Sequence, residues 1–139
     1  MTQIQGGCLC GAIRYTSAAQ PLMTAVCHCK HCQRQSGTAF SVLVALPAGT
    51  LELQGEAPAT YQDRGESGLA VMRHFCGKCG SPISSQVEAM PGMDWLKAGT
   101  LDDASWLQPQ VAIWCDHAQP WVPLGETMAQ FPKNPPPQA

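Results

Sequence analysis

The chain has 139 residues, a length that fits one domain with its own hydrophobic core. Its net charge is −2 and its lysines and arginines together number only eight, so the sequence lacks the basic surface typical of nucleic-acid-binding proteins. There is no apolar run of about 18 residues and no signal-like start. We therefore expect a cytoplasmic protein with neither a nucleic-acid partner nor a membrane contact.

Short alternating or β-branched segments follow one another along the chain and predict a mainly β protein. The expected strands cover residues 12–16, 40–46, 50–54, 69–75, 82–87 and 111–114. Helix is scarce: two short segments, residues 29–35 and 102–106, are each expected to form a short turn or helix. Twelve prolines and thirteen glycines are typical of a loop-rich sheet protein. We expect a single domain over residues 1–131, followed by a proline-rich tail over residues 132–139 that frays.

Seven of the eight cysteines fall in three short motifs. These are Cys8-Leu9-Cys10, Cys27-His28-Cys29-Lys30-His31-Cys32 and Cys76-Gly77-Lys78-Cys79. Spacers of one or two residues can bring two thiolates onto one ion. In the reducing cytoplasm such motifs favour metal binding, and a disulfide framework is the alternative.

The first and last motifs each supply two thiolates, and together they would complete a closed four-sulfur site of the structural zinc type. Its ligands would be Cys8, Cys10, Cys76 and Cys79. Glycines flank both pairs and permit the tight turns that such ligand loops need. Four thiolates also suit an iron–sulfur cluster, or a zinc ribbon that binds nucleic acid through a small basic patch, so the spacing alone leaves these alternatives open.

The central motif supplies three thiolates without a fourth cysteine nearby. Three protein ligands and one open position are typical of catalytic zinc, and the ligands here would be Cys27, Cys29 and Cys32. The alternative is a closed site in which a histidine or the distant Cys115 provides the fourth ligand. We expect His28 and His31 to be supporting or surface residues, because strand alternation turns His28 away from the neighbouring thiolates.

Three segments, taken in order, resemble the glutathione-dependent formaldehyde-activating (GFA) family, which also includes centromere protein V. They are residues 6–15, 27–37 and 73–83, which contain the three cysteine motifs. The resemblance continues through residues 98–103, Trp121-Val122 and Phe131-Pro132. It therefore covers nearly the whole chain.

This resemblance implies a β-tent fold of packed antiparallel sheets with two zinc ions per chain. It assigns the structural ion to Cys8, Cys10, Cys76 and Cys79 and the catalytic ion to Cys27, Cys29 and Cys32. It also implies a carbon–sulfur lyase that joins formaldehyde, or another small aldehyde, to glutathione or another small thiol. A noncatalytic zinc scaffold that binds a protein partner is the alternative.

Some positions have two interpretations. The family often has two arginines after the central motif, whereas this chain has Gln33-Arg34. Arg34 is a candidate for binding a substrate carboxylate, and an ordinary surface arginine is the alternative. We expect Cys115 and the four tryptophans to be packing residues, with a pocket lined by tryptophan as the alternative.

Overall fold

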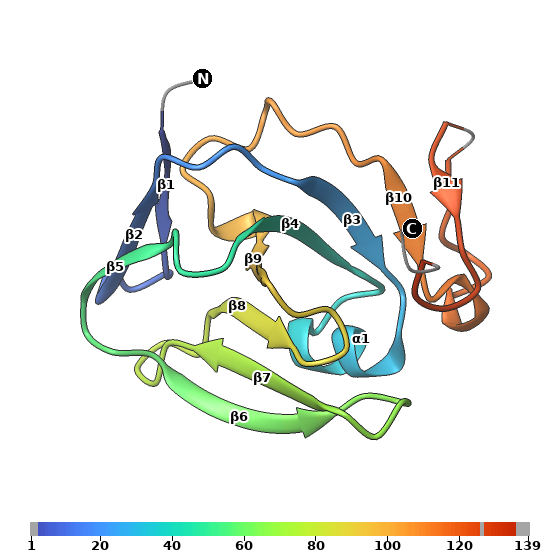
Figure 1. The fold of residues 1–139 in the computed structure, drawn as a ribbon, viewed down its shortest axis with the longest axis horizontal. Helices are drawn as coiled ribbons and strands as arrows, with labels where there is room; N and C mark the ends of the chain where they lie inside the picture. Colours follow the sequence, from blue (N-terminus) through green and yellow to red (C-terminus); the bar gives the residue numbers. More distant parts are fainter. Residues whose placement is uncertain (1–2, 126, 136–139) are drawn as a thin grey trace.

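The computed structural model describes residues 3–125 and 127–135, and Figure 1 shows their strands in two sheets. The smaller sheet is antiparallel and has the strand order β1-β2-β5. Its strands are β1 (Ile4–Gly7), β2 (Ile13–Ser17) and β5 (Glu52–Gly55). This small sheet packs beside β4 and β9 of the larger one.

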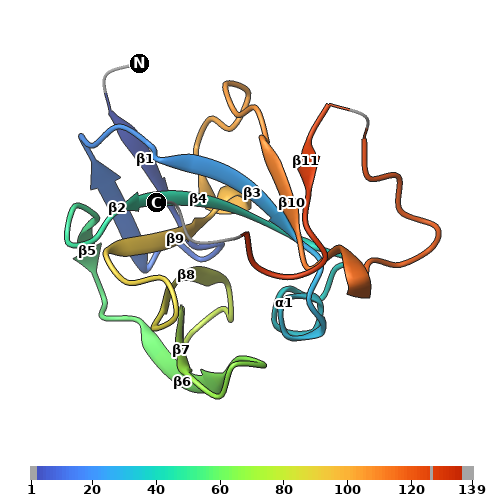
Figure 2. The same ribbon diagram turned by 45° about the vertical axis from the view of Figure 1, so that its right-hand side comes forward.

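The larger sheet has eight strands in the order β11-β10-β3-β4-β9-β8-β7-β6. They are β3 (Met23–Cys27), β4 (Ser41–Pro47), β6 (Ala59–Arg64), β7 (Ala70–Phe75), β8 (Pro82–Val87), β9 (Met93–Lys97), β10 (Val111–Ile113) and β11 (Ala129–Gln130). In Figures 1 and 2 the sheet curves from β11 over β4 and down to β6. The expected mainly β, β-tent fold is confirmed, with one correction: β10 runs parallel to both its neighbours, so this sheet is mixed.

Helical structure is short. The helix α1 (Lys30–Ser36) follows β3, and the two 3₁₀ turns are η1 (Ala98–Thr100) and η2 (Cys115–His117). No helix within residues 3–125 and 127–135 is long and apolar enough to cross a bilayer.

Strand alternation gives the large sheet two different faces. One face packs against the small sheet, and its core includes Val44, Leu46 and Leu96 together with Ile13 and Tyr15. The neighbouring residues along β4 and β9, which are Leu43, Ala45 and Trp95, point the opposite way. They form a second cluster with Ala25 and Cys27 of β3, Ile113 of β10 and Cys32 of α1. The first face therefore holds the two sheets together, and the second carries the central cysteine motif.

Of the turn or helix expected over residues 102–106, the structure has the turn, at Ser105–Trp106, and no helix. The carboxylate of Asp103 accepts hydrogen bonds from the N–H of Ser105 at 2.9 Å and from its hydroxyl at 2.6 Å. This local bonding gives the backbone an alternative to helix. The 3₁₀ turn η1 lies just before this segment, at Ala98–Thr100.

The first residues of the expected tail bond back to the domain rather than fraying. The N–H of Trp114 donates to the carbonyl of Lys133, and that of Asp116 donates to the carbonyl of Pro132. The indole N–H of Trp114 also donates to Asn134 Oδ1 at 2.8 Å. Residues 136–139 of that tail lie outside the described residues.

Candidate functional site

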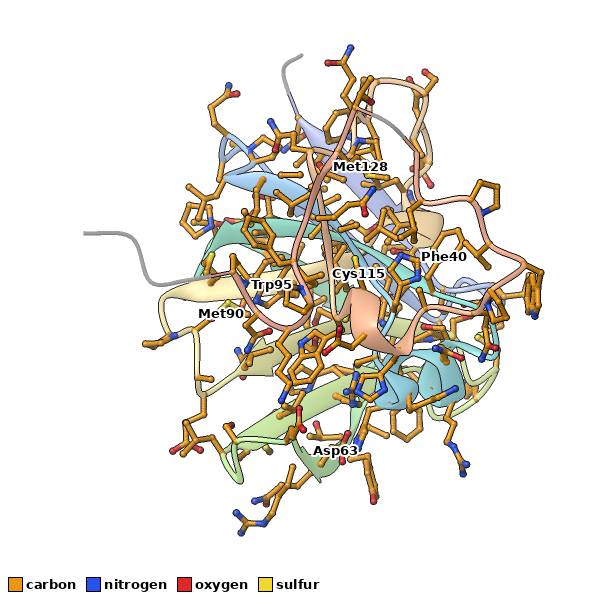
Figure 3. The ribbon with its side chains drawn as sticks, turned by 90° about the vertical axis from the view of Figure 1, so that its right-hand side faces the viewer. Phe40, Asp63, Met90, Trp95, Cys115 and Met128 are labelled. Atoms are coloured by element: carbon orange, nitrogen blue, oxygen red, sulfur yellow. The ribbon has the colours of Figure 1, made fainter. Side chains whose placement is uncertain are left out.

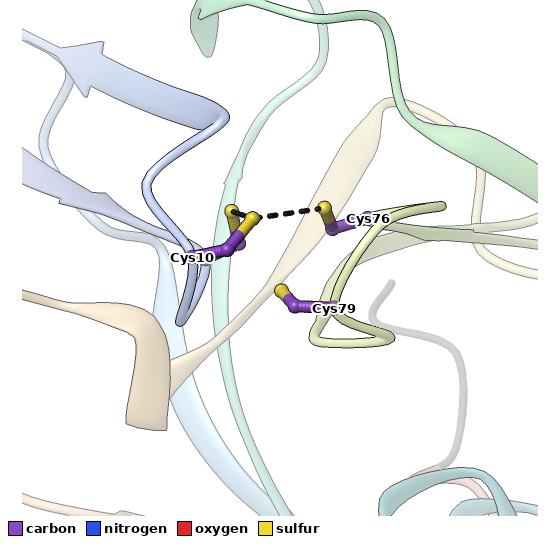
Figure 4. Close-up of side chains that lie close together, drawn as sticks. Cys10, Cys76 and Cys79 are labelled. Atoms are coloured by element: carbon purple, nitrogen blue, oxygen red, sulfur yellow. Dashed lines mark hydrogen bonds between the residues drawn. The ribbon is translucent and has the colours of Figure 1, made fainter.

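The first cysteine cluster joins two loops that are distant in sequence. The sulfurs of Cys8, Cys10, Cys76 and Cys79 lie within 4.8 Å of one another. Figure 4 shows Cys10 facing Cys76 across the cluster, with 3.8 Å between their sulfurs, and Cys8 and Cys10 are 3.7 Å apart. Two sulfurs bound at about 2.3 Å to one tetrahedral zinc ion lie about 3.8 Å apart. The spacing thus fits a four-sulfur metal site. All eight cysteines are free, so the disulfide alternative is wrong for this structure.

Backbone N–H groups orient the two buried sulfurs of this cluster. The N–H of Ile13 donates to Cys8 Sγ at 3.3 Å, and the N–H of Lys78 donates to Cys76 Sγ at 3.4 Å. Gly80 turns the second loop with φ of 81°, a conformation that suits glycine. Hydrogen bonds of this kind favour the thiolate, which is the form that binds metal.

The same four sulfurs cannot all be ionised at neutral pH without a cation among them. Hydrogen bonds from Ser81 lower the pKa of Cys79 to about 5. A hydrogen bond from Ala12 lowers the pKa of Cys10, but burial and the neighbouring sulfurs outweigh it and raise that pKa to about 11. Like charges this close separate their pKa values in this way. A metal ion at the centre would stabilise all four thiolates together.

The second cluster is built by the end of β3 and the start of α1. Cys27 is the last residue of β3, and Cys29 caps α1 by accepting the N–H of Cys32 at 3.2 Å. The sulfurs of Cys27, Cys29 and Cys32 lie within 4.8 Å of one another. No other His, Cys, Asp or Glu side chain of the described residues joins this group. The cluster therefore offers three ligands to a metal ion.

The candidate fourth ligands point elsewhere. His28 is buried, with its ring 5.5 Å from that of Phe40 and no hydrogen-bond partner on either nitrogen among the described residues. His31 is exposed, and its Nδ1 lies 2.7 Å from Asp63 Oδ2. Cys115 donates to the carbonyl of Ala112 and is part of neither cysteine group. Neither histidine belongs to the cysteine group, and of the two expected positions His31 has the surface one, whereas His28 is buried.

Two buried cations lie near the three-cysteine cluster. Arg73 donates through Nε to Asp63 Oδ2 at 2.9 Å, and Lys97 donates through Nζ to Ser41 Oγ at 2.7 Å. Both are only 6% exposed. Hydrogen bonds from the other two thiols lower the pKa of Cys32 to about 2, and attraction to both cations adds to the effect. The pKa values of Cys27 and Cys29 are raised at the same time, so these surroundings favour a thiolate at Cys32 and thiols at the other two positions.

The three cysteines open onto a cavity of about 720 Å³. Its walls are largely apolar and include Leu43, Val71, Val87, Met90, Trp95 and Ile113. In Figure 3, Trp95 and Met90 lie near the centre of this face, and Asp63 of β6 lies below them. A cavity of this size, lined mostly by apolar groups with a few reactive ones, has the features of a small-molecule site.

Arg34, the expected substrate contact, is exposed on α1 and lines a different hollow, which it shares with Lys30 and Trp121. Lys30 lines both this hollow and the main cavity. Gln33 has a structural role, because its side-chain amide donates to the carbonyls of His28 and His117 at 2.7 and 3.0 Å.

The tryptophans divide between the two expected roles. Trp95 is 2% exposed and lines the main cavity, and Trp114 lines it too. Trp106 packs partly buried against the core between the sheets. Trp121 is 71% exposed, so the packing expectation is wrong for that residue.

The fold and the two clusters define a mainly β protein with two cysteine sites that could each hold a metal ion. A family model described as glutathione-dependent formaldehyde-activating enzyme, GFA, matches residues 3–117. The chain belongs to this GFA family.

Several fungal relatives carry the provisional name glutathione-dependent formaldehyde-activating enzyme. One from Fusarium vanettenii is 24% identical over 108 residues, covering 76% of this chain and 57% of the relative. Those from Aspergillus flavus and Aspergillus oryzae are each 27% identical over 110 residues, covering 76% of this chain and 56% of the relative. The chain thus spans little more than half the length of these relatives.

The fold is also similar to the crystal structure of a Rhodobacter sphaeroides protein. The TM-score is 0.58 and the identity 19%, and the match covers 91% of this chain and 98% of that one. At this identity the likeness concerns the fold alone.

Proposed function

We propose that this chain is a zinc-dependent carbon–sulfur lyase that interconverts a small thiol and a small aldehyde with their thiohemiacetal adduct. The family description and the names of the relatives support glutathione as the thiol and formaldehyde as the aldehyde. The observation that carries the proposal is the three-cysteine cluster on the wall of a large cavity, with no fourth ligand among the described residues.

Two zinc ions per chain are part of this proposal. One would be held by Cys8, Cys10, Cys76 and Cys79 and would cross-link the two loops. An ion held by Cys27, Cys29 and Cys32 would supply, when bound, an open coordination position that favours a substrate thiolate or polarises an aldehyde carbonyl. The donor sets fit because zinc prefers thiolates and both groups bring their sulfurs close together.

The reaction needs no oxidant or reductant. In the forward direction a bond forms between the thiol sulfur and the aldehyde carbon, the carbonyl π electrons move to oxygen, and the thiol proton ends on that oxygen. The reverse reaction removes the hydroxyl proton and breaks the carbon–sulfur bond. Arg73 and Lys97 would offset the negative charge of the thiolates, and the apolar walls would exclude water.

Two exposed cations are proposed to bind the thiol substrate. Lys30 lines the cavity at its exposed edge, and Arg34 lies one turn further along α1. A glutathione carboxylate at this edge could contact either one. This keeps Arg34 as a proposed substrate-binding residue, with Lys30 added.

The proposal also covers the bounds of the domain and the cellular location of the protein. We propose residues 1–131 as the GFA-type domain and residues 132–139 as its tail. A cytoplasmic location would keep the eight free cysteines reduced.

The first test is elemental analysis of the reduced protein, with two zinc ions per chain expected. Exchange NMR would then measure whether the protein accelerates the interconversion of formaldehyde and glutathione with S-hydroxymethylglutathione. Cys29→Ser should lose one zinc ion and the acceleration, whereas Cys115→Ser, a change outside both clusters, should keep both. A protein that holds two zinc ions but accelerates no thiol–aldehyde pair would favour the noncatalytic scaffold instead.

A further inference from the structure

The cavity beside the three cysteines is far larger than a hydroxymethyl group. Its apolar walls come from one face of the large sheet, because paired strands present paired side chains to the same side. Trp95 lies opposite Ala45, and Val71 lies opposite Val87 on the next strand pair. These strands place an extended apolar wall next to Cys27 and the other two thiols.

Most of the charged groups around this cavity already have partners in the protein. Arg73 and His31 both contact the Asp63 carboxylate, at 2.9 and 2.7 Å. Lys133 pairs with Glu66 at 3.4 Å. Arg73, His31 and Lys133 therefore each have a carboxylate partner within the protein.

Lys30 differs from these cations, because no carboxylate of the described residues lies within ion-pair distance of it. It is exposed, so it lies where the cavity meets solvent. Glutathione carries two carboxylates and an ammonium group, and burying them against an apolar wall would be costly. The charged thiol therefore fits the edge of the cavity, near Lys30, and leaves the apolar interior to the other half of the adduct.

We propose that this site takes thiohemiacetals of apolar aldehydes, either medium-chain or aromatic, whose substituent fills the cavity. The inference rests on the proposed function and names its substrate class. The reaction is the same: the thiol sulfur bonds to the carbonyl carbon, and the thiol proton ends on the carbonyl oxygen. Only the group on that carbon changes, from the hydrogen of formaldehyde to an apolar chain or ring.

Binding can be tested without turnover by using stable thioethers of glutathione. S-methylglutathione imitates the size of the formaldehyde adduct, and S-hexylglutathione imitates that of a six-carbon aldehyde. Calorimetric titration of the zinc-loaded protein should show the hexyl compound binding at least about tenfold more tightly, because each buried methylene contributes about fourfold. Equal or weaker binding of the hexyl compound would overturn the proposal.

Variants of two methionines test whether the hexyl group of S-hexylglutathione binds in this cavity. Met90→Gln places a neutral polar group on the cavity wall and should lower the ratio of hexyl to methyl affinity several-fold, whereas Met90→Leu should preserve it. Met72→Gln is the matched control, because Met72 lies on β7 between Val71 and Arg73 and faces the opposite side of the sheet. A ratio that falls equally in the Met72 and Met90 glutamine variants would contradict the assignment to this cavity.

Turnover separates this inference from the proposed function. Exchange NMR with glutathione should show a higher kcat/KM for hexanal or benzaldehyde than for formaldehyde. Turnover of formaldehyde alone, with no gain from the hexyl group, would support the lyase and overturn the apolar substrate class. Tight hexyl binding without turnover of any aldehyde would overturn the lyase and leave the cavity as a site for apolar thioethers.

Discussion

Lys97 is buried near the three-cysteine cluster, and its positive charge helps to lower the pKa of Cys32. Burial lowers the pKa of Lys97, and attraction to the three thiolates opposes that effect. Without this cation the thiols would ionise less readily and bind metal less well. We predict that Lys97→Met weakens metal binding at the three-cysteine cluster about tenfold, as loss of a supporting group around a metal site commonly does.

Cobalt(II) titration with a competing chelator would measure this affinity through the absorption of the bound ion. The four-cysteine cluster of the same variant is the internal control, and its affinity should stay unchanged. If both clusters lost affinity equally, general destabilisation would explain the result better than charge.

Asp63 connects Arg73 and His31 at the edge of the cavity. Burial raises the pKa of Asp63, but hydrogen bonds from His31 and Arg73 outweigh it, so the pKa lies below its ordinary value. A carboxylate with a lowered pKa stabilises the fold above its unfolded pKa of about 4 and loses that contribution as pH falls through its folded pKa. We predict that Asp63→Asn lowers the free energy of unfolding by about 3 kcal/mol at neutral pH, because Arg73 is left buried without its partner.

Urea denaturation of wild type and variant at pH 7 and at pH 3 would measure the effect. The difference between the two proteins should shrink at the lower pH. Asp116→Asn, which changes an exposed carboxylate, is the control and should have little effect at either pH. A difference for Asp63→Asn that persists at pH 3 would show that packing, and not charge, is responsible.

At the scale of elements, β1 is held against η1 by an unusually close approach. Gly6 forms a β-bridge with Leu101, and a Cβ at Gly6 would overlap the Thr100 carbonyl oxygen and the ring of Tyr15. We predict that Gly6→Ala destabilises the protein by about 3 kcal/mol, because overpacking forces backbone to move. Thermal or urea unfolding would measure it. Gly99→Ala is the control, since a Cβ there meets no atom within 4 Å, and a similar loss in that variant would contradict the steric explanation.

The strands that the sequence predicts correctly have clear apolar or alternating patterns, such as β4 and β7. Among the missed strands, β1, β6 and β9 lack such patterns for physical reasons. β1 contains Gly6 and Gly7 because neighbouring groups leave no room for side chains. β6 is an edge strand with mostly exposed residues, and β9 includes the buried charges Asp94 and Lys97.

The candidate site shows the same division between local and long-range information. Spacing alone groups Cys27, Cys29 and Cys32, because these residues adjoin one another in one turn of chain. Arg73 and Lys97 come near them only through the pairing of distant strands, and no spacing rule indicates that. The alternation of Trp95 and Lys97 along β9 places them near the three cysteines only when the register of β9 against β4 is known.

For the molecule as a whole, a metal ion in each cluster would constrain the chain to a different extent. An ion in the four-cysteine cluster would connect Cys10 to Cys76 across 66 residues, and so would link the small sheet to the β7–β8 loop. An ion in the three-cysteine cluster would close only the short stretch from Cys27 to Cys32. By loop-closure entropy, a cross-link of the first kind stabilises the fold by roughly 4 kcal/mol and one of the second kind by roughly 2 kcal/mol.

We therefore predict that metal removal proceeds in two distinguishable steps. A chelator should first take the ion from the three-ligand cluster, which has one fewer protein ligand, and this step should abolish any thiol–aldehyde exchange while near-ultraviolet circular dichroism persists. Loss of the second ion should remove that signal, because the tie between the sheets is broken. A colorimetric zinc indicator in the same samples would measure how many zinc ions are released in each step.

Cysteine variants make the two-step prediction independent of the chelator. Cys29→Ser should lower the Tm only slightly, whereas Cys79→Ser should unfold much of the domain, and Cys115→Ser should behave like the wild type. Equal losses of Tm in the Cys29 and Cys79 variants would mean that both ions support the fold to the same extent. The division into a structural site and a reactive site would then have to be abandoned, because that division requires the cavity cluster to be dispensable for folding.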